Sequence, residues 1–119
     1  MAMGALAIAG MALSAGMASA ETWTVVEGDK GATYGVWQVS IEGNTVAGSA
    51  AMVGPKGKAL SYRVAGEIRD EKLVVHRVGP SDRSSCTYVV EMSRSDKLAG
   101  SALCGGMSYP WHVTRTGQR

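Results

Sequence analysis

The chain has few of the residues from which catalytic and metal centres are usually built. Its 119 residues include two cysteines and two histidines. Zinc sites usually bring their ligands in closely spaced pairs, and Cys86 and Cys104 lie too far apart for such a pattern. Redox-active dithiols are typically Cys-x-x-Cys motifs at the start of a helix, and the sequence contains none. We therefore expect no metal site, no cofactor and no dithiol chemistry.

The sequence also lacks the motifs of common hydrolases. It contains no nucleophile elbow, no zinc-peptidase helix and no β-lactamase motif. Its carboxylates are scattered and do not form the pair that acid/base catalysis needs. His76 and His112 are both predicted to point outward from strands as solvated side chains. We predict that the protein is not an enzyme; a small enzyme whose residues converge only in three dimensions remains an alternative.

A block of positive charge is missing as well. The chain has twelve basic and ten acidic residues, and its formal net charge is +2. These charges are distributed along the sequence, with no Lys/Arg cluster that could follow a phosphate backbone. The composition therefore argues against a nucleic-acid partner.

The first twenty residues, MAMGALAIAGMALSAGMASA, contain no charged or aromatic residue. An apolar run is followed by small residues at Ala18–Ala20 and then by polar Glu21, an order typical of a secretory leader, although no Lys or Arg precedes the run. A membrane anchor is the alternative, which the Ala- and Gly-rich composition disfavours. We predict a signal peptide over residues 1–20 and a single domain over residues 21–119. We expect the mature protein to be periplasmic or extracellular, without stable membrane insertion.

Helical periodicity is absent after Ala20, and short runs with two-residue alternation recur between turn residues. Strands are predicted at Thr22–Val26, Val36–Glu42, Thr45–Val53, Ser61–Ile68, Leu73–Val78, Cys86–Met92, Leu98–Leu103 and Trp111–Thr116. Short, evenly spaced strands favour an all-β fold. We predict a small antiparallel eight-stranded meander barrel, because closure removes the sheet edges; a two-sheet β-sandwich is the alternative.

The hairpin registers predict a filled core. A turn at Gly43–Asn44 places Trp37 opposite Ala50 and Val39 opposite Gly48. The same pairing of a bulky residue with a small one recurs in the hairpins centred on Asp70–Glu71 and on Ser95. The aromatic residues, namely Trp23, Trp37, Tyr62, Tyr88 and Trp111, could line a pocket, but the small residues opposite their strands favour core packing. The predicted inward set is Trp37, Val39, Ile41, Tyr62, Val64, Ile68, Tyr88, Val90, Met92, Leu98, Trp111 and Val113.

The two cysteines fall opposite each other in the last of these hairpins. Opposed residues of an antiparallel pair lie within the distance that a disulfide spans. An exported protein meets an oxidising environment, where an even pair of cysteines is expected to be bonded. We therefore predict a structural disulfide between Cys86 and Cys104.

Candidate contacts for a ligand or partner lie in loops and near a barrel end. If His76 faces outward, Arg77 faces inward, where it could hold an anion; the alternative is a bulge that returns it to solvent. Two exposed lysines, Lys56 and Lys58, are predicted on the loop GPKGKA. The stretch GGMSYP is predicted to be a loop that exposes Met107 and Tyr109, and GPSDRSS (residues 79–85) is predicted to be another. Binding residues are often found on loops of a rigid scaffold.

The predicted strand number and size are similar to those of avidin-like and lipocalin-like domains and of periplasmic β-barrel protease inhibitors. The likeness includes no sequence motif, and a fold alone does not carry a function. We expect a non-catalytic binding or accessory protein of the bacterial cell envelope. Its partner would be a protein, a glycan or a small molecule; a protease-inhibitor-like role is an alternative.

Overall fold

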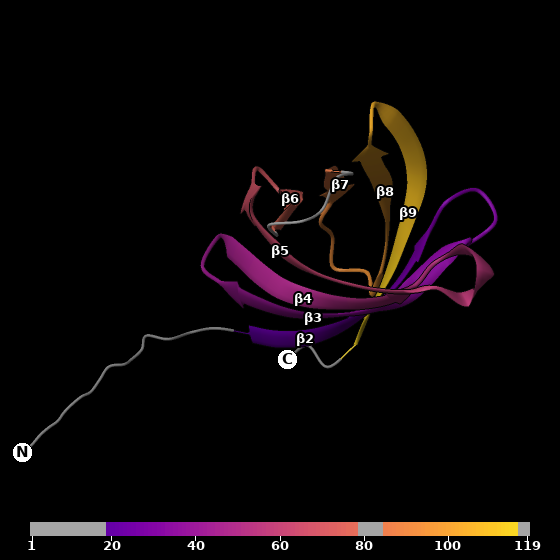
Figure 1. The fold of residues 1–119 in the computed structure, drawn as a ribbon. Coiled ribbons are helices and arrows are strands. Elements are labelled where there is room, and N and C mark those ends of the chain that lie inside the picture. The colour runs from indigo at the N-terminus through magenta and orange to yellow at the C-terminus, as the bar shows by residue number, and fades with distance from the viewer. Residues whose placement is uncertain (1–18, 79–84, 117–119) are drawn as a thin grey trace, which may run out of the picture.

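The computed structural model describes residues 19–78 and 85–116, which form a closed antiparallel barrel. Its strands are β2 (Ser19–Glu27), β3 (Thr33–Glu42), β4 (Thr45–Val53), β5 (Ala59–Arg69), β6 (Lys72–Val78), β7 (Cys86–Glu91), β8 (Lys97–Cys104) and β9 (Met107–Thr116). Each strand pairs with the next, and β9 pairs with β2 to close the sheet (Figure 1). The predicted eight-stranded meander barrel is confirmed, and the sandwich alternative is wrong.

The predicted leader falls mostly outside the described residues. Only its last two residues, Ser19 and Ala20, are described, and they begin β2 by pairing with Ile41 and Ser40. Cleavage before Glu21 therefore stays a prediction. Within residues 19–78 and 85–116, no helix has the length and apolar character needed to cross a membrane.

The predicted hairpin registers are confirmed where strands continue. Trp37 pairs with Ala50, and Tyr88 pairs with Ala102. The glycines opposite bulky residues are tightly enclosed: a Cβ placed on Gly100 would collide with the carbonyl oxygen of Val89. Glycine at this position therefore permits close approach of the neighbouring strand.

Aromatic rings fill the centre of the barrel. The three indoles and the ring of Tyr88 are completely buried. Trp37 stacks on Trp23 with ring centroids 6.3 Å apart, and it packs against Tyr88 and Trp111 at 5.0 and 5.1 Å. Such offset and edge contacts are favourable for aromatic rings. The core packing predicted for the aromatic residues is confirmed for Trp23, Trp37, Tyr88 and Trp111, and Tyr62 packs against this core while partly exposed.

Several strands begin or end a few residues away from the predicted boundaries, and two of these differences change the expected loops and pairings. The stretch Gly105–Pro110 is not a loop, because β9 begins at Met107 after a tight turn of Gly105 and Gly106. Both glycines adopt positive φ (58° and 83°), which suits a two-residue hairpin turn and lets the strands run up to it. At the other boundary β7 ends at Glu91, and the N–H of Met92 donates to the carbonyl of Glu71 instead of pairing with Leu98.

Candidate binding site at the barrel mouth

A meander places its connections alternately at the two ends of the barrel. One end, here called the mouth, carries the β2–β3, β4–β5 and β8–β9 connections together with the end of β6 and the start of β7. The opposite end, here called the base, carries the β3–β4, β5–β6 and β7–β8 turns, the start of β2 and the end of β9. Each end contains inward-facing charged side chains, which the two-residue alternation of the strands directs into the barrel.

A pocket of about 320 Å³ lies at the mouth. It is lined by Glu27, Gly28, Ala32, Thr33, Pro55, Arg77, Cys86, Cys104 and Tyr109. A larger depression of about 520 Å³ includes exposed small residues of the outer wall, such as Ser40, Ala47 and Ser49. The larger depression also includes an acidic and a basic residue, Glu21 and Arg63, but Glu21 already accepts hydrogen bonds from Trp23 and Arg115.

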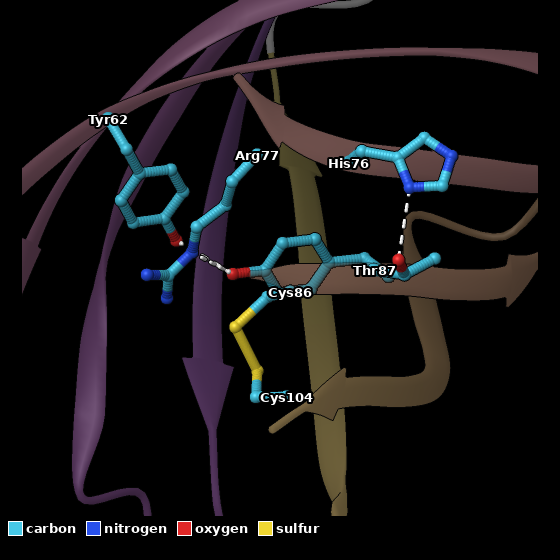
Figure 2. The surroundings of a disulfide bond; sticks show 7 residues. Tyr62, His76, Arg77, Cys86, Thr87 and Cys104 are labelled. Atoms are coloured by element: carbon cyan, nitrogen blue, oxygen red, sulfur yellow. Dashed lines mark hydrogen bonds between the residues drawn. A yellow bond between two sulfur atoms is a disulfide. The ribbon is translucent and has the colours of Figure 1, made fainter. Parts of the chain in front are cut away.

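Arg77 lies half-buried on the inner side of β6. The ladder with β5 continues without a bulge, pairing Arg77 with Val64. The Nε of Arg77 donates a 2.8 Å hydrogen bond to the hydroxyl of Tyr88, and its guanidinium carbon lies 4.1 Å from the centre of the Tyr62 ring. Figure 2 shows this guanidinium beside Tyr62, with His76 directed to the other side of the strand. The inward orientation of Arg77 is confirmed; contact with a ligand stays a prediction.

Glu27 supplies the negative charge of the pocket. It ends β2, where its position pairs with Thr33 of β3 and with Trp111 of β9. Its Oε1 atom is buried and has no hydrogen-bond partner among the described residues. Burial raises the pKa of Glu27, and the nearby charge of Arg77 offsets only part of that rise. Glu27 is therefore a buried acceptor that the described part of the protein leaves unsatisfied.

Two tyrosine hydroxyls lie next to Arg77 below the pocket. The hydroxyl of Tyr88 donates to that of Tyr62 across 3.4 Å while it accepts from Arg77. Burial raises the pKa of Tyr62. Burial, together with the neighbouring Tyr62, also raises the pKa of Tyr88. Both hydroxyls thus stay protonated at neutral pH and act as hydrogen-bonding groups that hold Arg77 in place.

The predicted disulfide is present and forms part of the pocket wall. Cys86 and Cys104 are bonded, with Cα atoms 4.3 Å apart, and no described cysteine is free. Cys86 is almost completely buried. The disulfide joins β7 to β8 directly beside Arg77 (Figure 2).

The structure brings the predicted contact residues to the same end of the barrel. Tyr109 lines the pocket, while Met107 is 58% exposed at the rim, opposite Cys104. Lys56 and Lys58 are exposed on the β4–β5 connection, where Pro55–Gly57 form the short helix η2. The GPSDRSS stretch falls outside the described residues, except for Ser85.

Sequence reasoning missed Glu27 as a site residue. The available signal was its place two residues after Val25, which shares the inward face of β2 with Trp23. The sequence pattern predicts that the strand ends at Val26 and places Glu27 in a loop. Site residues at the end of a strand are easily missed, because the sequence pattern predicts the ends of strands less reliably than their existence.

The base holds a second charged cluster that sequence reasoning also missed. Glu21 accepts hydrogen bonds from Trp23 Nε1 at 2.7 Å and from Nε and Nη2 of Arg115, each at 2.8 Å. Glu21 is 5% exposed. Burial acts to raise the pKa of Glu21, but the hydrogen bonds from Arg115 and Trp23 and the charge of Arg115 leave it lowered. This cluster joins the first strand of the barrel to the last.

Metal-binding groups are not gathered anywhere in the described part of the chain. No set of three or more histidine, cysteine, aspartate or glutamate residues there could hold a metal ion. His76 is exposed, and its Nδ1 lies 3.0 Å from the hydroxyl of Thr87. His112 is also exposed, on the outer face of β9.

These features define a small disulfide-bonded β-barrel with a pocket at one end that is lined by one acidic and one basic side chain. No protein-family model, curated protein or solved structure matches the chain. Its function must therefore be argued from the barrel itself.

Proposed function

We propose that the protein is a non-catalytic binding protein that takes a small ligand into the mouth of its barrel. The single observation that carries the proposal is the buried Oε1 of Glu27, which has no hydrogen-bond partner in the described part of the protein. A buried acceptor without a donor costs free energy, so a ligand that supplies the donor gains affinity. Small-molecule sites are typically pockets of this kind, with a few convergent polar groups.

A binding role is better supported than a catalytic one. The cysteines are joined in a disulfide, so neither offers a thiolate. Burial raises the pKa of Tyr62 and Tyr88, which makes their hydroxyls poor nucleophiles. The two histidines are exposed on the outer wall, away from the inward Glu27 and Arg77.

The proposal places the protein outside the cytoplasm, in the periplasm or beyond. A disulfide in a small domain is typical of an oxidising compartment, and the sequence before Glu21 has the pattern of a secretory leader. A protease-inhibitor role would suit an extended loop that the disulfide clips to the rigid barrel. The tight turn at Gly105–Gly106 removes the best candidate for that loop, so we favour ligand binding.

Screening by NMR tests the proposal. The folded, oxidised protein would be titrated with a fragment set of small amines, carboxylates, amides, amino acids and monosaccharides. We expect at least one fragment class to shift the amide signals of Gly28 and Thr33 at the mouth, with little effect on Gly43 at the base. Binding confined to other surfaces would overturn the proposal. Chemical turnover of a bound fragment would favour the enzyme alternative, and inhibition of a serine protease would favour the inhibitor alternative.

A further inference from the structure

We infer that the mouth end of the barrel docks on the surface of a lipid bilayer that carries anionic headgroups. The docking surface combines exposed lysines with a set of exposed apolar side chains, here called the apolar rim: Tyr34, Val36, Val78, Leu103 and Met107. The inference concerns a macromolecular surface rather than the ligand in the pocket, so it goes beyond the proposed function.

The large apolar side chains that are exposed in the described part of the chain all lie at the mouth. Tyr34 and Val36 lie in the first half of β3, which begins at the mouth, and Val78 is the last residue of β6, which ends there. Leu103 lies one residue before the end of β8, and Met107 begins β9. Exposed apolar groups gathered in one region mark a site of interaction with a protein or a membrane.

The apolar rim surrounds the opening of the barrel instead of forming one compact patch. Tyr34, Val78 and Leu103 belong to β3, β6 and β8, no two of which are adjacent in the closed strand order. A peptide that lies in one groove would reach a single member of the rim, whereas a flat surface that meets the barrel end-on contacts every member together. This distribution favours a bilayer surface.

The tip of the β8–β9 hairpin projects furthest from the closed sheet. At the mouth β2 pairs with β9 only as far as Trp111, whereas β8 and β9 stay paired up to Cys104 and Met107. The disulfide to Cys86 fixes this hairpin to β7. The exposed Met107 is therefore presented on a rigid support, so that little freedom is lost when it enters the headgroup region.

Lysines accompany the apolar rim. Lys30 lies in the β2–β3 connection, and Lys56 and Lys58 lie in the β4–β5 connection, all three exposed at the mouth. In the mouth connections that the structure describes, the one exposed acidic residue is Asp29. Each lysine held near an anionic bilayer adds to the attraction. A second copy of the chain, docked mouth to mouth, would instead bring the same lysines together.

The base differs from the mouth in both respects. Its turns carry the acidic residues Asp70, Glu71 and Asp96 and the basic residue Arg94. None of the large apolar side chains that are exposed among the described residues lies at the base. An anionic surface therefore attracts the mouth in preference to the base, which orients the barrel on the bilayer.

Vesicle co-sedimentation tests the inference with the folded, oxidised protein. Vesicles of phosphatidylcholine alone would be compared with vesicles of phosphatidylcholine and phosphatidylglycerol in equal parts, at about 0.1 M salt. We expect the anionic vesicles to bind at least about ten-fold more tightly than the neutral vesicles, and further salt should weaken that binding. With a nitroxide-labelled lipid in the vesicles, the amide signals of Gly57 and Gly106 at the mouth should lose more intensity than that of Gly43 at the base.

Two double variants separate the charged from the apolar contribution. Lys56→Glu/Lys58→Glu should weaken binding to the anionic vesicles about ten-fold or more, because two attractions become repulsions. Leu103→Ser/Met107→Ser should weaken it about five-fold or more, because less apolar area enters the headgroup region.

The matched control is Arg94→Glu/Lys97→Glu, because both side chains are exposed at the base and the change in net charge is the same. This variant should bind the anionic vesicles within about two-fold of the unaltered protein, since salt screens charges that lie away from the bilayer. Dispersed amide spectra should establish that every variant is folded.

Three results would overturn the inference: equal binding to the two kinds of vesicle, no binding to the anionic vesicles at millimolar lipid, or the same loss in the base control as in Lys56→Glu/Lys58→Glu. Self-association in the absence of lipid that Leu103→Ser/Met107→Ser abolishes would identify the apolar rim as a contact between protein copies and would also overturn it. The fragment titration of the pocket is made without vesicles, so ligand binding succeeds or fails independently of lipid binding.

Discussion

Each end of this barrel contains an inward-facing glutamate and an inward-facing arginine, but the two glutamates differ in their hydrogen bonds. At the base, Glu21 and Arg115 form an ion pair with 2.8 Å contacts, and Trp23 adds a further donor to the carboxylate. At the mouth, Glu27 and Arg77 line an open pocket, and Oε1 of Glu27 has no partner among the described residues. Burial acts on both carboxylates, yet the pKa of Glu21 is lowered and that of Glu27 is raised.

The difference lies in hydrogen bonding rather than in charge. A buried carboxylate is tolerated when its oxygens accept hydrogen bonds from a paired cation, and it is costly when they do not. The Glu21–Arg115 ion pair at the base therefore stabilises the contact between the first and last strands. The mouth retains a hydrogen-bond acceptor on Glu27 that the described residues do not satisfy, and a ligand site requires such a group.

Breaking the Glu21–Arg115 ion pair at the base should have the largest effect on stability. Arg115→Met leaves the carboxylate of Glu21 buried without its cation, and we expect a loss of about 3–5 kcal/mol in the free energy of unfolding. Urea denaturation followed by tryptophan fluorescence measures this change. The double variant Glu21→Gln/Arg115→Met should recover much of the loss; a double variant as unstable as Arg115→Met would contradict the role of the unpaired charge.

Removing the disulfide should have the next largest effect and should act at the mouth. In the chain-entropy model, Cys86→Ser/Cys104→Ser loses about 3 kcal/mol, because the unfolded chain gains freedom. Urea denaturation measures the loss, and amide hydrogen exchange locates it. Exchange should increase more in β7 and β8 near the pocket than in β2 and β9 near Glu21. A uniform increase would mean that the two ends do not differ in this respect.

Overpacking the core between the ends should have a smaller effect. Gly100→Leu forces a side chain against the neighbouring strand and should cost ~1–3 kcal/mol. Ala99→Leu is the matched control, because Ala99 is exposed on the adjacent position of β8, and it should change stability by less than about 0.5 kcal/mol. Thermal denaturation of both variants tests the expectation, and equal effects would argue against a filled interior.

The pH dependence of stability should distinguish Glu21 from Glu27, and we expect this effect to be the smallest of the four. The lowered pKa of Glu21 means that its stabilisation is present above the pKa of the unfolded chain and is lost as pH falls through its folded value. The raised pKa of Glu27 has the opposite sign, so that stability is gained as pH falls through its folded value.

Urea midpoints measured across the acidic range should show this contrast. At neutral pH Glu21→Gln should lower stability, and Glu27→Gln should raise it or leave it unchanged. Each variant should also lack the pH-dependent change in stability that its replaced carboxylate causes in the unaltered protein. A parallel response of the two variants would show that both ends are satisfied to the same degree.

Much of the barrel could be predicted from local sequence pattern. Alternation of apolar and polar residues, together with turn residues such as Gly43–Asn44, specified the strands and their registers. The opposition of Cys86 and Cys104 followed from one of those registers. The sequence pattern does not predict the tight turn at Gly105–Gly106, because Pro110 suggests a loop. Pro110 lies instead within β9, and its carbonyl accepts a 2.9 Å hydrogen bond from the N–H of Gly28.

The sequence by itself determined the strands, the hairpin pairings and the disulfide, because each depends on neighbours that are close along the chain. The alternation within each strand also determined which aromatic side chains point inward. Only the tertiary structure decided how the barrel closes and which charges meet. The closing pair β2–β9 brings Glu21 to Arg115 across 94 positions, and the curvature of the sheet brings Glu27 to the pocket of Arg77. No local pattern encodes such contacts, since they depend on the summed geometry of every strand between them.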